Sequence, residues 1–273
     1  MRICVLSSGS KGNSCYIETK ETKLLIDVGT TTTYIANELD KLGVKPKEID
    51  AILITHAHVD HIHGLKSFIN KYNPLIYVTE KLLGILEEQV GNFRYEIYQD
   101  KQAIINDVRI NLIKTSHDAG EQMGFVIKNN DKSMVYITDT GYINSRYFDI
   151  LSNRNLYVLE SNHDVLMLKN GPYPYFLQQR VVGDKGHLSN DQASSYLCKF
   201  IGKDTKAVVF AHLSENNNTE EKVLETFNNK LKENKMKFDN VIIARQNEAT
   251  KVIEIWLKLL LWEKSKKSIL KMQ

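Results

Sequence analysis

The feature that most constrains this chain is a run of histidines and a carboxylate directly after an apolar segment. Residues 49–54 are mostly apolar and β-branched, a pattern that predicts a buried strand. Residues 55–61, with the sequence THAHVDH, follow at once, and a helical pattern begins after them. The run therefore lies on a turn between a strand and a helix, where α/β proteins usually bind their ligands.

The residue types in this run favour a metal site. Neutral imidazole is a common ligand of borderline-soft cations, and carboxylate suits harder ones. His56 and His58 lie two apart in a nearly extended segment, so their side chains point to the same side and can share one ion. Asp60 and His61 belong to the following turn, where they can hold a second ion. A solvated histidine-rich loop is the alternative, but it would not explain the order and density of the run.

Other histidines and carboxylates follow other predicted strands. These residues are Asp27, His117, Asp139, His163 and His212, while His187 lies just before a predicted helix. Separate strand ends of a sheet can converge on one point, so these side chains are candidates for the same site. Asp27 ends a buried strand and needs a polar partner, and pairing with a ligand imidazole would fix the tautomer of that ring. A simple turn is the alternative explanation of Asp27.

The rest of the chain alternates predicted strands and helices. Strands are expected at 2–7, 15–18, 23–27, 76–78, 95–98, 108–113, 123–127, 134–137, 156–160, 207–210, 241–244 and 251–255. Helices are expected at 33–43, 79–90, 190–201 and 220–234. Residues 165–186 are expected to be irregular. Either Ser189 or Asn190 is the expected cap of the helix that begins near 190.

The composition narrows the class of protein. The chain has 273 residues and 42% hydrophobic residues, enough for a sizeable core without disulfides. Its three cysteines have no CxxC spacing and are expected to be reduced thiols. No signal peptide and no membrane-spanning stretch are predicted, so we expect a cytoplasmic protein. The net charge of +3 permits an anionic partner without requiring one.

The segment 256–273 differs from the rest of the chain because it is first apolar and then basic. It is expected to be an amphipathic tail. Such a tail could dock on the core, bind a protein partner, lie on a membrane surface or be partly disordered. We therefore expect a domain at 1–255 followed by a separate tail at 256–273.

The order of these motifs resembles that of the metallo-β-lactamase superfamily. Asp27 resembles its first motif, residues 55–61 its second, and His117, Asp139 and His212 the three that follow. The resemblance covers almost all of the predicted domain. It implies an α+β fold, a four-layer αββα sandwich, with a binuclear metal site at one edge of the sheets.

Within this superfamily, four segments are similar to the YycJ/WalJ group of cytoplasmic bacterial proteins. They are residues 6–14, 159–164, 171–174 and 186–190. This group is similar to the nuclease branch that includes tRNase Z and the β-CASP enzymes. The segment between Asp139 and His212 is too short for an inserted β-CASP domain.

The resemblance also implies a set of metal ligands. One ion would be held by His56, His58 and His117, the other by Asp60, His61 and His212, and Asp139 would bridge them. Zn²⁺ is the first expectation, with Mn²⁺ or Fe²⁺ as alternatives. Two cations about 3.5–4 Å apart share a water and lower its pKa, which would supply a hydroxide that attacks phosphorus. Asp60 can orient that water, and His187 or His163 could protonate the leaving oxygen.

Several loop residues are candidates for substrate contacts. Ser8, Ser10 and Asn13 lie in a small-residue loop that offers hydroxyl and backbone donors, and Arg180 and Ser189 lie farther along the chain. Ordinary explanations exist for each of them. The loop can be a plain hairpin turn, and charged loop residues are usually just solvated.

Our leading functional hypothesis is a metal-dependent phosphodiesterase that acts on nucleic acid, as an exonuclease on DNA in preference to RNA. The first alternative is a hydrolase of small molecules such as esters, thioesters, lactones, lactams or cyclic phosphodiesters. The second alternative is a metal-bearing interaction protein in cell-wall regulation or DNA repair, with the tail as its docking segment.

Overall fold

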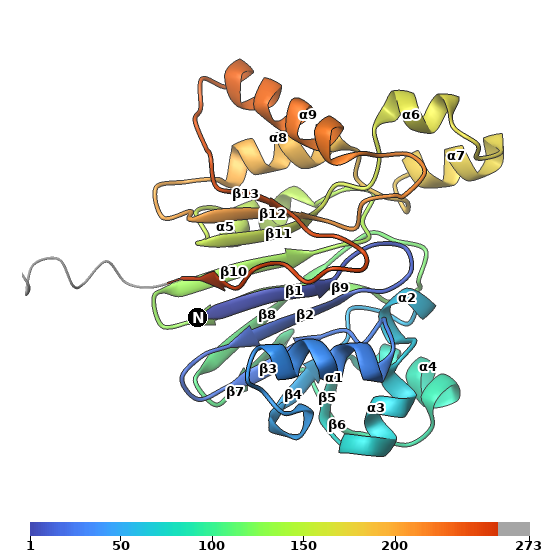
Figure 1. Ribbon diagram of the computed structural model, residues 1–273, viewed down its shortest axis with the longest axis vertical. Helices are drawn as coiled ribbons and strands as arrows, with labels where there is room; N and C mark the ends of the chain where they lie inside the picture. Colours follow the sequence, from blue (N-terminus) through green and yellow to red (C-terminus); the bar gives the residue numbers. More distant parts are fainter. Residues whose placement is uncertain (256–273) are drawn as a thin grey trace, which may run out of the picture.

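The described part of the chain, residues 1–255 of a computed structural model, contains two seven-stranded β-sheets packed face to face (Figure 1). The order in the first sheet is β14 (Ile253–Glu254), β1 (Arg2–Ser7), β2 (Ser14–Glu18), β3 (Lys23–Ile26), β4 (Ala51–Leu53), β5 (Leu75–Val78) and β6 (Arg94–Ile97). The order in the second is β13 (Val241–Ile243), β12 (Ala207–Ala211), β11 (Leu156–Glu160), β10 (Lys132–Ile137), β9 (Met123–Asn129), β8 (Val108–Lys114) and β7 (Gln102–Ile105). The tail expected at 256–273 lies outside the described residues.

Each sheet is antiparallel in one half and parallel in the other. The pairs from β14 to β3 and from β7 to β10 are antiparallel. The pairs from β3 to β6 and from β10 to β13 are parallel. Because parallel neighbours end at the same edge of a sheet, the residues that follow β3 and β4 come together, as do those that follow β10, β11 and β12.

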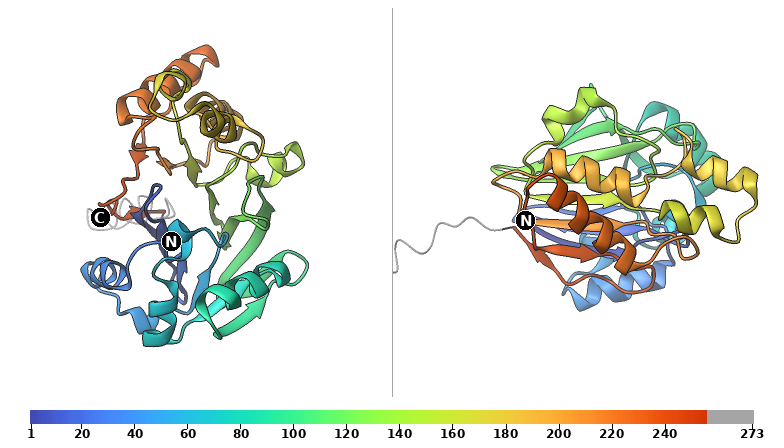
Figure 2. Two further views of the ribbon diagram at one scale, coloured as in Figure 1. Left: turned by 90° about the vertical axis from the view of Figure 1, so that its right-hand side faces the viewer. Right: turned by 90° about the horizontal axis from the view of Figure 1, so that it is seen from above.

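Helices cover the outer face of both sheets, which confirms the predicted four-layer αββα architecture (Figures 1 and 2). The helices on the first sheet are α1 (Thr32–Lys41), α3 (Leu65–Tyr72) and α4 (Glu80–Val90), and those on the second are α5 (Phe148–Leu151), α8 (Asn190–Phe200) and α9 (Glu220–Glu233). The short helix α2 (Val59–Ile62) and two single turns of 3-10 helix, Pro46–Glu48 and Ser145–Tyr147, lie in connections. Within residues 1–255, none of the helices combines the length and the apolar character needed to cross a membrane.

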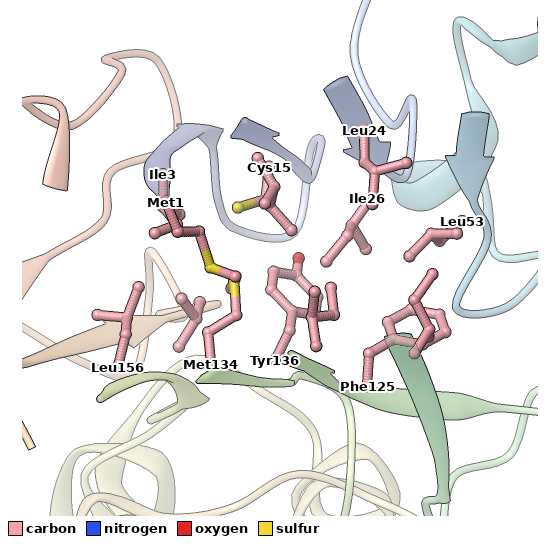
Figure 3. Packing of buried hydrophobic residues seen from close by; sticks show 14 of the residues in the cluster. Met1, Ile3, Cys15, Leu24, Ile26, Leu53, Phe125, Met134, Tyr136 and Leu156 are labelled. Carbon is pink, nitrogen blue, oxygen red and sulfur yellow. The ribbon is translucent and has the colours of Figure 1, made fainter. Parts of the chain in front are cut away.

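The period-two alternation of strands places apolar side chains on both faces of each sheet. In β1, Ile3 and Val5 belong to the core between the sheets, whereas Cys4 and Leu6 pack with the helices. Figure 3 shows the central core, where side chains of the first sheet face those of the second, Tyr136 among them. A strand buried on both faces is almost continuously apolar, which is why these strands could be recognised in the sequence.

One sequence prediction about the fold is wrong. Residues 165–186, expected to be irregular, contain two helices, α6 (Val165–Asn170) and α7 (Tyr175–Val182). We call residues 165–182 the arm. Asp164 caps α6, but five large apolar side chains of the arm are exposed and each helix has a single buried residue, so no continuous buried face marked these helices in the sequence. The arm projects on the same side of the molecule as α2 (Figure 1).

Candidate metal centre

The candidate metal centre lies where parallel strands of both sheets end. Asp27 follows β3, Asp139 lies just beyond β10, and His212 follows β12. The backbone φ angles of these residues are 59°, 53° and 54°, in the left-handed region. Asp and His adopt this region more readily than most residues, yet it persists only where surrounding contacts impose it. Such turns bring the side chains together, and His212 Nε2 lies 3.3 Å from Asp139 Oδ1.

The histidine run occupies the turn between β4 and α2, as the sequence predicted. His56 and His58 precede α2, whereas Asp60 and His61 lie within its first turn. The chain packs very closely against this helix. A Cβ atom on Gly29 would lie 1.8 Å from the carbonyl oxygen of Asp60, so glycine is required there. This approach fixes the position of α2 relative to the end of β3.

The first group of potential ligands comprises His56, His58 and His117, whose ligand atoms lie within 4.8 Å of one another. His56 Nδ1 lies 3.0 Å from the Thr55 hydroxyl, and His56 Nε2 is buried with no hydrogen-bond partner among residues 1–255. His117 Nδ1 lies 3.0 Å from the carbonyl oxygen of Gly186. Because a neutral oxygen holds Nδ1 of each of these two rings, Nε2 is the nitrogen that they can offer to an ion.

The second group comprises Asp60, His61, Asp139 and His212, whose ligand atoms also lie within 4.8 Å of one another. His61 Nδ1 lies 2.7 Å from Asp27 Oδ2. The opposite nitrogen of the same ring, Nε2, lies 3.2 Å from Asp139 Oδ2. His212 Nε2 lies 3.4 Å from Asp60 Oδ2. The carboxylate of Asp139 therefore faces both imidazoles of this group, one with each oxygen.

Glu160 is a functional candidate that the sequence analysis missed. It ends β11 and is fully buried. Its Oε1 lies 2.7 Å from His187 Nδ1 and 3.1 Å from His212 Nδ1, and its Oε2 accepts hydrogen bonds of 3.0 Å from the N–H groups of Thr140 and Leu188. The signal in the sequence was the one that identified Asp27, a carboxylate at the end of an apolar strand. With Asp139, these acidic and imidazole groups form a third possible ligand set.

The two main groups differ in electrostatics. Burial by itself lowers the pKa of His61 and His212, but the charges and hydrogen bonds of the neighbouring carboxylates, Asp139 first among them, together outweigh it. The pKa of His61 is raised well above its usual value, and that of His212 to about 10. Burial, followed by the charge of a neighbouring histidine, lowers the pKa of His56 and of His58. The second group thus has the stronger negative potential.

The donor atoms of these groups fit divalent cations. Imidazole nitrogens and carboxylate oxygens suit Zn²⁺, Mn²⁺ and Fe²⁺ alike. His56 Nε2 is buried without a hydrogen-bond partner among residues 1–255, which a bound cation would provide. Two such groups side by side have room for two ions. Asp139 belongs to the second group, and its role as a bridge to the first stays a prediction.

Two predicted substrate contacts lie directly against the metal centre. The Ser8 hydroxyl accepts a 2.8 Å hydrogen bond from the N–H of His212. Asn13 Nδ2 lies 3.2 Å from Asp60 Oδ2 and 3.1 Å from His61 Nε2, and the Asn13 side chain is fully buried. Both residues thus position the candidate ligands in this structure, and their contact with a substrate stays a prediction.

Ser10 and Arg180 line a cleft of about 150 Å³ beside the metal centre, together with His117 and His187. Arg180, on the arm, donates a 2.6 Å hydrogen bond from Nε to Asp118 Oδ2. Asp118 is a second residue that the sequence analysis did not select, although it directly follows His117. The ion pair connects the arm to the loop that carries a candidate ligand.

Ser189 and His163 are paired with each other by a short β-bridge and do not line this cleft. The Ser189 side chain accepts a 3.2 Å hydrogen bond from the N–H of Gln192, so Ser189 is the helix cap of α8, one of the two predicted. The carbonyl oxygen of His163 accepts a 2.9 Å hydrogen bond from the N–H of Asn190. The ring of His163 is buried, and within the described chain it belongs to none of the potential ligand groups.

Comparison with known proteins was made on sequence and on structure. A protein-family model described as the Metallo-beta-lactamase superfamily matches residues 8–212. The chain is 38% identical over 233 residues to Exodeoxyribonuclease WalJ of Streptococcus pneumoniae serotype 2, strain D39. This alignment covers 83% of this chain and 87% of that protein. It is 35% identical over 229 residues to Exodeoxyribonuclease YycJ of Bacillus anthracis, which covers 81% of this chain and 85% of that protein.

The structural comparison agrees with the sequence comparison. The crystal structure of the metallo-beta-lactamase fold protein YhfI from Bacillus subtilis aligns with a TM-score of 0.68, covering 91% of this chain and 98% of that one. Only 15% of the residues are identical, so this likeness concerns the fold alone.

Proposed function

The chain belongs to the metallo-beta-lactamase superfamily, and from this premise we propose that it is a binuclear metal-dependent nuclease that degrades DNA as an exonuclease. The observation that carries the proposal is the juxtaposition of the two ligand groups, in which the ring centroids of His56 and His61 are 4.0 Å apart. The relatives named exodeoxyribonucleases support DNA as the substrate, because they match over four-fifths of this chain.

The two ions would be held by the ligand set expected from the sequence, with Asp139 between them and Zn²⁺ preferred to Mn²⁺ or Fe²⁺. When bound, they would lower the pKa of water and neutralise charge on a phosphate. Asp60 faces His61 and His212 in the second group, and its carboxylate can accept a proton from the attacking water.

His187 is the better of the two candidates for the general acid. Its ring centroid lies 4.9 Å from that of His117 and 5.4 Å from that of His212, so it faces both ligand groups. Burial lowers its pKa, but the charge and hydrogen bond of Glu160 and the charge of Asp139 together outweigh burial, and the raised pKa favours a protonated ring near neutral pH. Burial lowers the pKa of His163 to about 4. Its ring is therefore neutral near pH 7 and has no acidic proton to give to a leaving group.

The remaining parts of the proposal extend the sequence predictions. The proposal includes a preference for DNA over RNA, a cytoplasmic location and a protein partner bound through residues 256–273. So does the division of the chain into a domain at 1–255 and a tail.

The test uses purified full-length protein loaded with Zn²⁺ or Mn²⁺. It is incubated with linear DNA and RNA labelled at one end, with circular DNA as a substrate that has no end. We expect stepwise shortening of linear DNA and no cleavage of the circle. The matched control is the Asp60→Ala, His61→Ala variant. The proposal is contradicted if wild-type protein that is shown to contain both metals degrades DNA no faster than this variant does.

The same preparation distinguishes a nuclease from the alternative, a hydrolase of small molecules. Chromogenic esters, thioesters, lactones and cyclic phosphodiesters are assayed beside DNA. Turnover of one of these with no degradation of DNA would replace the nuclease with a small-molecule hydrolase.

A further inference from the structure

A second depression, outside the cleft described above, carries three cationic side chains. It has a volume of about 460 Å³, and its lining residues are Lys101, Lys114, Thr115, Ser116, Tyr142, Asn144 and Arg146. We call it the basic groove. The lining includes no carboxylate. In the cleft, by contrast, Arg180 is already paired with Asp118 at 2.6 Å.

The wall of the basic groove is formed by two of the loops that carry candidate ligands. Ser116 directly precedes His117, and Tyr142 lies three residues beyond Asp139. The two loops are joined, because the N–H of Gly141 donates a 2.9 Å hydrogen bond to the carbonyl oxygen of Ser116. A molecule that lies in the groove is therefore held against the loops that lead into the metal centre.

The cations of the groove are available to an external anion. No ion pair of Lys101, Lys114 or Arg146 is found within residues 1–255. Arg146 is instead placed by Tyr147, over whose ring it lies at 4.6 Å and to whose hydroxyl it donates a 2.7 Å hydrogen bond. The same hydroxyl accepts a 3.2 Å hydrogen bond from the main-chain N–H of Lys114, which ties the backbone of Lys114 to the residue that holds Arg146.

We infer that the basic groove binds the sugar-phosphate backbone of a single DNA strand that leads into the metal centre. Unpaired lysine and arginine side chains that line one groove are the usual partners of phosphate groups. Tyr142, with 40% of its surface exposed at the groove, offers an aromatic face on which a base can stack. This inference rests on the proposed nuclease function and specifies how that function holds its substrate.

The test compares three full-length variants. The groove variant is Lys101→Gln, Lys114→Gln, Arg146→Gln. The matched control is Lys203→Gln, Lys206→Gln, Lys237→Gln, which changes the net charge equally at exposed positions near the beginnings of β12 and β13, the strand ends remote from His212. A third variant, Lys101→Arg, Lys114→Arg, Arg146→Lys, keeps the charges of the groove.

Binding is measured by fluorescence anisotropy in Mn²⁺, with a labelled single-stranded phosphorothioate oligonucleotide that resists cleavage. We expect the groove variant to bind at least about tenfold more weakly at low salt and to lower the slope of log Kd against log salt by about 2, which corresponds to the loss of three phosphate contacts. The control and charge-preserving variants should match the wild type. Replacement of Tyr142 by Leu should weaken binding by roughly tenfold with no change in slope.

Failure of this inference is distinguishable from failure of the proposed function. If the wild type degrades DNA but the groove variant keeps its affinity and salt slope, the inference is overturned and the nuclease remains. An equal loss in the charge-preserving variant also overturns it, because charge would not then be the cause. If the wild type, with both metals present, neither binds nor degrades DNA, the nuclease and the groove fall together.

Discussion

The two groups of candidate ligands are adjacent but supported differently. Among the first group, His56 and His117 are oriented by a hydroxyl and a main-chain carbonyl, and the side chain of His58 is 35% exposed. In the second group, His61 and His212 are almost fully buried, and each has a carboxylate on Nδ1. A carboxylate partner makes an imidazole a stronger donor to a metal. We therefore expect the second group to bind its ion more tightly and the first to exchange its ion more readily.

The difference also assigns different tasks to the two ions. An ion in the second group would be held among buried side chains anchored to strand ends of both sheets. His117 of the first group lines the cleft, so an ion held there would border on it. The first group is thus suited to contact the substrate, and the second is suited to keep a permanent charge in place.

The largest expected effect comes from Asp139→Asn, which tests whether the two groups are independent. Asp139 faces both imidazoles of the second group, and the proposal makes it a bridge to the first. We expect kcat/KM for DNA to fall by roughly 10³-fold, because metal ions stabilise transition-state charge by several kcal/mol and each 1.4 kcal/mol is tenfold. Metal analysis should show weaker binding of both ions. Retention of one ion at wild-type affinity would show that Asp139 serves a single group.

The second prediction concerns His163, a buried ring that interacts electrostatically with Glu160. Burial lowers its pKa from 6.5 to about 4, so the folded protein keeps this ring neutral while the unfolded chain takes up a proton. Stability is therefore lost as the pH falls from about 6.5 to about 4, by up to about 3 kcal/mol. In His163→Asn, the drop in unfolding free energy between pH 7 and pH 4 should be smaller by about this amount.

The measurement is denaturant unfolding of the metal-free protein at both pH values, so that metal loss does not contribute. Comparing the change with pH, rather than the stability itself, removes the cost of altered packing in the variant. An identical pH dependence in the two proteins would mean that His163 is not kept neutral by burial.

The candidate ligands could be predicted from the sequence because each follows an apolar strand, and the order of the motifs supplied the pairing. The apolar runs likewise predicted most strands of both sheets. Glu160 was missed because the sequence did not reveal which strand-end carboxylate meets an imidazole. The contact of Arg180 with Asp118 joins positions 62 residues apart and depends on two helices that each bury only one residue, too little to mark them in the sequence.

The third prediction compares the carboxylates on Nδ1 in the second group with the neutral oxygens that occupy Nδ1 of His56 and His117 in the first. In Asp27→Asn, His61 keeps a hydrogen-bonding partner but loses the charge on it. We expect the affinity for one of the two ions to fall by about 10- to 100-fold, the usual effect of losing such a partner. Competition with a chelator measures it, with Glu18→Gln as a control in the same sheet. Equal weakening of both ions would contradict the separate support of the two groups.

The smallest effect is expected from Asp118→Asn, the corresponding change beside the first group. Asp118 Oδ1 lies 3.4 Å from His117 Nε2 and 3.7 Å from His58 Nε2, longer than the carboxylate contact of His61. Its side chain is 30% exposed, so solvent screens its charge. We expect the affinity of the first group for its ion to fall only a few-fold, on the order of 1 kcal/mol or less. A loss as large as that in Asp27→Asn would show that the first group also depends on a carboxylate, and the two groups would then differ only in burial.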